Sequence, residues 1–222
     1  MKECPRCLNR NPDFFGIRNN EKYCRACIGL LGKEAELYKG VIDPNYQLGF
    51  KLTPYQQALS DQLVSIGLTE DVLIEAVCGA GKSEIVLELV SCALEKGLRV
   101  GWMIARRQVV LQLSERLSSI FSNLKVIGVA GEQTSELDGD LIVLTAHQLY
   151  CYPHAFDLVI VDEPDAYPFK DNVLLHGLLE VACKGTKIYL TATPDKHLMD
   201  DIKNHLRLDR RPHNRKLVVP SV

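Results

Sequence analysis

The chain has 222 residues, of which 46% are hydrophobic and 24% are charged, and its formal net charge is −2. This composition is too apolar for a disordered protein, and no run approaches the roughly 18 apolar residues of a membrane-spanning helix. The polar start does not fit a signal peptide, so we expect a cytoplasmic protein with a full domain and a small appendage. The charge is uneven, with +3 over residues 1–40, −9 over 41–195 and +4 over 196–222. Basic ends fit nucleic-acid binding, but ordinary surface variation produces such a split too.

Four of the eight cysteines form two C-x2-C pairs near the start, Cys4 with Cys7 and Cys24 with Cys27. Each pair can turn tightly and direct two thiolates at one ion, and two pairs complete a tetrahedral site with no open position. Because so short a segment buries little core, the ion would supply its folding energy. We therefore predict a module over residues 1–30 that binds Zn²⁺. The alternatives are an iron site of the rubredoxin type and four unrelated cysteines.

The remaining chain alternates between strand-like and helix-like segments after a mixed stretch over 31–50 that reads as a linker. Apolar runs predict strands at 72–77, 99–105, 141–146, 157–162 and 187–191. Helical patterns lie at 54–66, 82–95, 108–121 and 172–183. Strands separated by helices indicate crossover connections, so we expect an α/β domain over 51–205 with a mostly parallel sheet covered on both faces. Residues 195–222 fit one helix and then a basic linker, which we place at 206–222.

A phosphate-binding loop follows the first predicted strand of this domain. Residues 76–83 match the phosphate-loop pattern, with alanine in place of its first glycine. Gly79, Ala80 and Gly81 would let backbone N–H groups converge on phosphate oxygens at the start of a helix. Lys82 would reach the β- and γ-phosphates of ATP, and Ser83 would bind Mg²⁺.

Two adjacent acids end the apolar strand at 157–162. Asp162 would reach the Mg²⁺ ion of the phosphate loop through water, and Glu163 could polarise an attacking water molecule. Acids that only cap the next helix are the alternative, but two of them directly after a buried strand favour the catalytic interpretation. Together with the phosphate loop, they predict a nucleotide hydrolase.

Three polar residues elsewhere narrow the class further. Gln56 follows a Thr-Pro helix start, and its amide could pair with both edge groups of adenine. Thr191 and Thr193 end the last predicted strand, where their hydroxyls could couple the carboxylates to a nucleic-acid track. Taken alone, the glutamine would be a surface residue and the threonines an ordinary strand exit.

Taken in order, Gln56, the phosphate loop and segments 162–165 and 191–194 resemble the first lobe of superfamily 2 helicases, in which alanine commonly opens the phosphate loop. With a four-cysteine module ahead of it, the chain resembles the ComFA family of late-competence DNA-uptake helicases. Segments 145–149, 155–158, 165–169 and 211–213 are similar to that family too, so the likeness runs from Cys4 to about Pro220. Two features depart from it. Pro164 stands where the family more often has valine, and residues 105–107 replace a Pro-Arg pair.

This resemblance implies a RecA-like fold and an ATPase that moves along single-stranded DNA during natural transformation, with ATP, Mg²⁺ and Zn²⁺ as cofactors. The positions of its DNA-facing motifs are occupied here by Arg106, Arg107, Gly131, Thr145 and His147. A motor track needs phosphate contacts rather than base contacts, because it must tolerate every sequence. For the two arginines, exposed residues at a helix start are the alternative.

The resemblance also implies partners and a missing part. The partners would be other competence proteins, such as ComFC and a DNA-processing protein, with membrane contact only through them, at the inner face of the cell membrane. Motors of this class bind ATP between two lobes, and we expect 206–222 to lead toward a second one. These residues alone should then bind Mg-ATP weakly and hydrolyse it poorly. The alternatives are a superfamily 2 motor of replication restart or restriction, and a zinc-containing nucleotide-binding adaptor without motor activity.

Overall fold

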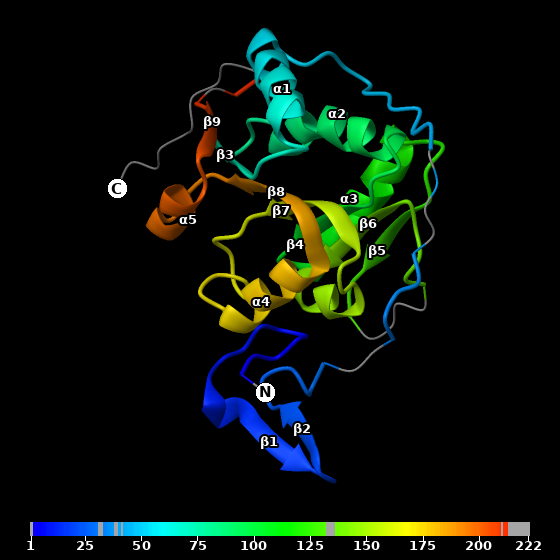
Figure 1. Ribbon diagram of the computed structural model, residues 1–222. Helices are drawn as coiled ribbons and strands as arrows, with labels where there is room; N and C mark the ends of the chain where they lie inside the picture. Colours follow the sequence, from blue (N-terminus) through cyan, green and yellow to red (C-terminus); the bar gives the residue numbers. More distant parts are fainter. Residues whose placement is uncertain are drawn as a thin grey trace.

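The computed structural model describes residues 2–30, 33–37, 40, 42–131, 136–209 and 211–212. These residues form a small hairpin module and a larger lobe built on one sheet (Figure 1). The helical elements are η1 (Pro12–Phe14), α1 (Pro54–Ile66), α2 (Lys82–Glu95), α3 (Arg107–Ile120), η2 (Ala146–Cys151), α4 (Val173–Ala182) and α5 (Lys196–Asp201). The strands are β1 (Phe15–Arg18), β2 (Glu21–Cys24), β3 (Val72–Ala76), β4 (Val100–Ile104), β5 (Val126–Val129), β6 (Leu141–Thr145), β7 (Phe156–Asp162), β8 (Cys183–Thr191) and β9 (Asn204–Leu208).

The module is an antiparallel hairpin between the two cysteine pairs. Phe15 pairs with Cys24 and Arg18 with Glu21, so the turn consists of Asn19 and Asn20. Both asparagines have positive φ, 51° and 65°, as a tight hairpin turn requires. The hairpin thus sets the second cysteine pair beside the first.

The lobe contains a seven-stranded sheet in the order β5-β6-β4-β7-β8-β3-β9, and every pair in it is parallel. The predicted fold class, a parallel α/β sheet behind a small cysteine module, is confirmed. The sequence patterns missed β5 and β9, the two edge strands. β9 alternates polar and partly buried residues and lacks an apolar run, because only one neighbour covers it. It crosses our proposed boundary at 205, and residues 213–222 of the proposed linker lie outside the described residues.

Helices cover both faces of the sheet (Figure 1). Apolar residues of α1, α2 and α3 form one core with the strands, including Leu63, Leu89 and Leu117. Leu149 of η2 and Leu178 of α4 belong to the core on the opposite face. Within the described residues, no helix is long and apolar enough to cross a membrane.

The cysteine module packs directly on the second of these faces. All four of its paired cysteines are buried in the same apolar cluster as residues of η2 and α4. The contact is closest at Gly177 of α4, where a Cβ atom would overlap the carbonyl group of Cys7. The stretch that connects the module to α1 also contacts the lobe, since the N–H of Ala35 donates to the carbonyl of Cys151 (2.7 Å). Module and lobe therefore meet over a packed surface as well as through the linker.

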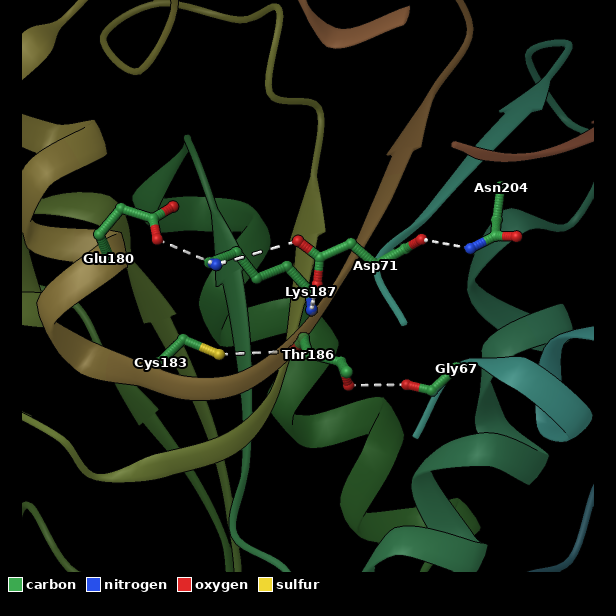
Figure 2. Close-up of polar contacts among 7 residues, drawn as sticks. All are labelled: Gly67, Asp71, Glu180, Cys183, Thr186, Lys187 and Asn204. Atoms are coloured by element: carbon green, nitrogen blue, oxygen red, sulfur yellow. Dashed lines mark hydrogen bonds and ion pairs between the residues drawn. The ribbon is translucent and has the colours of Figure 1, made fainter. Parts of the chain in front are cut away.

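A polar cluster fastens β8 to its neighbours at the amino end of β3 (Figure 2). Only 10% of the Lys187 side chain is exposed, and its ammonium group lies 3.1 Å from Glu180 and 3.9 Å from Asp71. The backbone N–H of Lys187 donates to Asp71 Oδ1 (2.8 Å), and Thr186 Oγ1 donates to the carbonyl of Gly67 (2.7 Å). These bonds satisfy a buried charge and fix the register of β8 against β3.

Candidate nucleotide site and metal centre

The loop between β3 and α2 has the geometry of an anion-binding turn. Gly79 and Gly81 have φ of 76° and 81°, a region that other residues rarely adopt. A Cβ atom on Gly81 would also lie 2.5 Å from Nε2 of Gln56. Ala80, which is fully buried, closes the turn by donating its N–H to the carbonyl of Val77 (3.0 Å). The loop therefore ends at the amino terminus of α2, where free N–H groups and the helix dipole favour an anion.

A cavity of about 740 Å³ opens at this loop. Its lining brings together Lys82 and Ser83 of α2 with Asp162 and Glu163 at the end of β7. The other lining residues are Phe50, Lys51, Thr53, Gln56, Gly79, Gly81, Glu84 and Pro212. β7 is separated from β3 only by β8, so parallel strands deliver the loop and the two acids to the same edge of the sheet.

Asp162 is mostly buried, and burial changes the pKa of its carboxyl group. Burial raises the pKa of its carboxyl group to about 6, the ammonium group of Lys82 opposes this rise, and Glu163 adds to it. A carboxylate in this setting gains from a nearby cation, so both Lys82 and Mg²⁺ fit it. Ser83 would supply a hydroxyl oxygen to the same ion, a donor that Mg²⁺ accepts.

Glu163 is held in a backbone conformation that the sequence did not reveal. Its φ is 55°, in the left-handed region, although it is not glycine. Its N–H donates to the carbonyl of Leu190 on β8 (2.9 Å), which fixes the turn directly after β7. The exposed side chain of Glu163 therefore lines the cavity beside Asp162 and does not continue the strand. Strain of this kind is common at functional sites.

The amide group of Gln56, the predicted adenine contact, makes hydrogen bonds within the protein. It is only 3% exposed, and its Nε2 donates to the carbonyl of Ala80 in the phosphate loop (2.8 Å). Its Oε1 accepts from the N–H and the hydroxyl of Thr53, both at 2.9 Å. The amide thus ties the start of α1 to the loop. Its Nε2 carries a second N–H donor, so pairing with adenine stays a prediction.

Several residues at the cavity were not singled out from the sequence. Phe50 is 56% exposed and offers an aromatic surface on which a base can stack, and Lys51 follows it. The segment after β9 returns to the loop, where Pro212 lines the cavity and Arg211 Nε donates to the carbonyl of Cys78 (2.9 Å). The only sequence signals were an aromatic residue before the Thr-Pro helix start and the segment 211–213, which by itself indicated no position.

Thr191 and Thr193 both contact Asp165, the third acidic residue in segment 162–165 at the end of β7. The hydroxyl of Thr191 donates to Asp165 Oδ1 (2.7 Å), and that of Thr193 donates to Asp165 Oδ2 (2.5 Å). Burial would raise the pKa of Asp165, but these two hydroxyls outweigh it and the pKa is lowered. The end of β8 is therefore linked to the acidic segment by two hydrogen bonds.

The residues placed at DNA-facing motifs lie at or just after the ends of β4, β5 and β6. Arg106 precedes α3 and Arg107 begins it, and both are exposed. Arg107 lies beside Gly131, which follows β5 with a φ of 89°. Thr145 ends β6, and His147 is exposed in η2. These strands form one half of the sheet, so the five residues share its carboxyl edge with the cavity but lie on the β4-β6-β5 side.

The four paired cysteines meet at one point. Their sulfur atoms all lie within 4.8 Å of one another. The Sγ atoms of Cys4 and Cys27 are 3.7 Å apart, and those of Cys7 and Cys24 are 3.8 Å apart. A tetrahedral ion with Zn–S bonds of about 2.3 Å requires sulfur atoms about 3.8 Å apart, so the donor set fits Zn²⁺. An iron ion with four thiolates fits the same geometry.

Burial governs the protonation of these thiols. It raises the pKa of Cys7 and raises that of Cys27 to about 11. These two thiols are therefore favoured in the neutral form without a metal, and binding of an ion must release their protons. At Cys24, the backbone N–H groups of Ala26 and Cys27 outweigh burial, and the pKa is lowered. Metal binding and folding of the module should be coupled.

Comparisons with known proteins agree with this architecture. The family model "Type III restriction enzyme, res subunit" matches residues 49–196. The helicase domain of Hef from Pyrococcus furiosus has a similar fold, with a TM-score of 0.55 and 19% identity over 70% of this chain and 39% of that one. A nuclease-deletion mutant of the type ISP restriction-modification enzyme LlaGI, solved with a DNA substrate mimic, gives a TM-score of 0.51 and 17% identity over 72% of this chain and 20% of that one. The lobe therefore has the RecA-like fold of helicases.

Two curated relatives match almost the whole chain. Competence protein ComFA of Bacillus subtilis is 33% identical over 98% of this chain, and ComFA of Streptococcus pneumoniae is 36% identical over 98%. The chain spans about half the length of these relatives, 51% and 54%. The resemblance to ComFA seen in the sequence is confirmed, and the chain belongs to the family described as the res subunit of type III restriction enzymes.

Proposed function

We propose that the chain is the nucleotide-binding part of an ATP-driven motor of helicase superfamily 2, which moves along single-stranded DNA during DNA uptake. One observation carries the proposal: Lys82, Ser83, Asp162 and Glu163 line a single cavity beside a phosphate-binding loop. The role in competence rests on the likeness to the two ComFA proteins. The helicase class rests on the family match and the fold.

The loop amides and four side chains of the cavity would each have a part in hydrolysis. The loop amides and Lys82 would hold the β- and γ-phosphates. Ser83 and Asp162 would hold Mg²⁺, which neutralises charge on the phosphate oxygens. Glu163, whose side chain lines the cavity, would orient the attacking water and accept its proton. A second lobe would supply the arginines of an efficient active site, so the 222 residues alone should hydrolyse ATP poorly.

The other half of the sheet edge fits a DNA track. Arg106 and Arg107 are exposed and would contact phosphates, with Gly131, Thr145 and His147 beside the strand. The contacts of Thr191 and Thr193 with Asp165 would couple this track to the nucleotide. Other competence proteins, such as ComFC, would be partners, and the module with Zn²⁺ would be a structural part rather than a catalytic one.

Nucleotide affinity tests the cavity directly. Lys82→Ala should weaken binding of Mg-ATP about 100-fold, because it removes the ammonium group beside the phosphates. Lys96→Ala is the matched control, since Lys96 is an exposed lysine just after the far end of the same helix. Isothermal titration calorimetry of both variants would give the affinities, and thermal melts would confirm that both remain folded. Equal affinities for the two variants would contradict the proposed site.

Turnover and DNA uptake test the motor. These 222 residues should release phosphate slowly even with single-stranded DNA, and robust strand-stimulated turnover would contradict the need for a second lobe. In the intact protein, Lys82→Ala should abolish uptake of transforming DNA while partner binding persists. Unchanged uptake would favour the adaptor without motor activity.

A further inference from the structure

The buried tryptophan of β4 has a polar group with no ordinary partner. Trp102 is fully buried, and its Nε1 is inaccessible to solvent and makes no hydrogen bond of standard geometry. Buried N–H groups without a partner are rare, because they lose their bonds to water. An orphan donor beside an active site therefore requires an explanation.

The strand register directs this donor toward Asp162. β4 and β7 are parallel neighbours, in which Trp102 pairs with Ile160 and Ile104 pairs with Asp162. Trp102, Ile104 and Ile160 all face the core under α1, α2 and α3, whereas Met103 and Val161 face the other core. Because side chains alternate along a strand, Asp162 lies on the same face as Trp102, one diagonal step away. An indole ring reaches across such a diagonal.

The pKa of the Asp162 carboxyl group is consistent with an indole N–H that points toward it. The indole of Trp102 is among the groups that lower the pKa of Asp162, against the larger effect of burial. A donor lowers the pKa of a carboxyl group only when it interacts with the ionised form. The strand register thus places the indole ring on the same face as the Asp162 carboxyl group, although no hydrogen bond of standard geometry joins them in this structure.

We propose that Trp102 is a positioning residue for Asp162, and that its indole N–H donates a hydrogen bond to the carboxylate when Mg-nucleotide occupies the cavity. The bond would hold one carboxylate oxygen, so that the other faces the ion and its water molecules. An N–H bond to an ionised carboxylate is stronger than one to a neutral acceptor. This inference rests on the nucleotide site proposed above.

The chain has a single tryptophan, so ¹⁵N-labelled protein has one indole N–H resonance. Adding Mg-ADP should move the indole proton downfield, as a closing hydrogen bond does. The same titration of Lys82→Ala should leave the resonance in place. In the protein without nucleotide, Asp162→Ala should move the resonance, whereas Glu163→Gln should move it less because the strand register places Asp162, and not Glu163, on the face of Trp102.

Measurements of Mg-ADP affinity distinguish a positioning role of Trp102 from a role in packing alone. Trp102→Phe should weaken Mg-ADP binding roughly tenfold while ADP binding without Mg²⁺ changes less than about twofold. Ile104→Val is the matched control, because it removes one methyl group beside Asp162 and no donor. It should bind Mg-ADP within about twofold of the wild type. Should Trp102→Phe fail to fold, the resonance shifts of the wild type and of Asp162→Ala decide.

The indole resonance and the nucleotide affinities test the role of Trp102 separately. An indole resonance that stays in place while Mg-ADP binds would overturn it, as would equal losses for Trp102→Phe and Ile104→Val. Both results would leave the nucleotide site intact. A wild-type protein that binds no Mg-ADP at all would instead reject the proposed function, and this inference with it.

Discussion

The cysteine module and the carboxyl edge of the main sheet both gather distant side chains, but they hold them differently. The module brings together four thiols from 24 residues of chain, with a two-stranded hairpin as its only sheet. The sheet edge gathers groups as far apart as Phe50 and Pro212. Behind that edge lie two apolar cores, so we expect its geometry to persist without a ligand.

The module and the sheet edge therefore differ in what holds their polar side chains in place. In the module, the four cysteines take the place of a core, and we expect an ion to hold them. In the lobe, hydrophobic packing holds the strands and the polar groups follow from strand order. We therefore expect metal removal and nucleotide removal to have very different structural effects.

Metal removal should have the largest effect on the structure. Chelation under reducing conditions should unfold the module, because a structural zinc site contributes on the order of 10 kcal/mol. Hydrogen exchange should show loss of protection over residues 2–30 and little change in β3, β7 and β8. The lobe should still bind Mg-ATP. Protection of the module that survives chelation would show that it has a sufficient core of its own.

Substitutions give the same test without a chelator. Cys24→Ser should mimic metal loss, whereas Cys78→Ser, at an exposed cysteine outside the module, should leave the metal in place. Metal analysis should find about one equivalent of zinc or iron in the wild type. Less than about half an equivalent would contradict the metal site.

The second prediction concerns the surface on which the two regions meet. Alanine within a helix is favoured over glycine by about 1 kcal/mol. At Gly177 of α4, the new Cβ atom would overlap the backbone of Cys7, so Gly177→Ala should instead destabilise by about 1–3 kcal/mol. Urea unfolding would measure the sign, and hydrogen exchange would show whether the module separates from the lobe.

Gly29→Ala is the matched control within the module, because nothing lies within 4 Å of a Cβ atom at that position. It should change stability by a few tenths of a kcal/mol. If Gly177→Ala were more stable than the wild type, the module would not be packed on α4 as described, and the two regions would be independent.

The sequence predicted the cysteine module more completely than it predicted the sheet. Cysteine spacing alone indicated the metal site, since ligand pairs at fixed spacing need little long-range structure. The central strands were visible as apolar runs because both of their faces are buried. The edge strands β5 and β9 were not. β5 has only four residues, one of them Gly128, and in β9 the exposed residues His205 and Arg207 interrupt the apolar pattern.

Some parts of the cavity could be predicted from short sequence segments, and others could not. The phosphate loop and the acid pair were visible as short segments following apolar strands. The left-handed turn at Glu163 was not visible, because it depends on a hydrogen bond to Leu190 from another strand. The tie from Gln56 to Ala80 likewise requires α1 to pack on the loop. Such contacts follow from tertiary structure and have no signature in neighbouring residues.

The smallest expected effect on stability comes from removing one hydrogen bond in the lobe, which apolar packing holds together. Thr191 is fully buried and its hydroxyl donates to Asp165, so Thr191→Val should destabilise by about 1 kcal/mol near neutral pH. Thr69→Val is the control, since its exposed hydroxyl donates to the carbonyl of Ile66, three residues earlier in the chain.

The pH dependence of this effect follows from the lowered pKa of Asp165 in the folded protein. A group of this kind stabilises the fold above its unfolded pKa, and the stabilisation is lost as the pH falls through the folded value. The difference in unfolding free energy between Thr191→Val and the wild type should therefore shrink once the pH is well below 3.8, the ordinary value for aspartate. Urea unfolding at both pH values would measure it. A difference that stays constant with pH would mean that the hydroxyl acts through packing at the end of β8 and does not stabilise the ionised carboxylate.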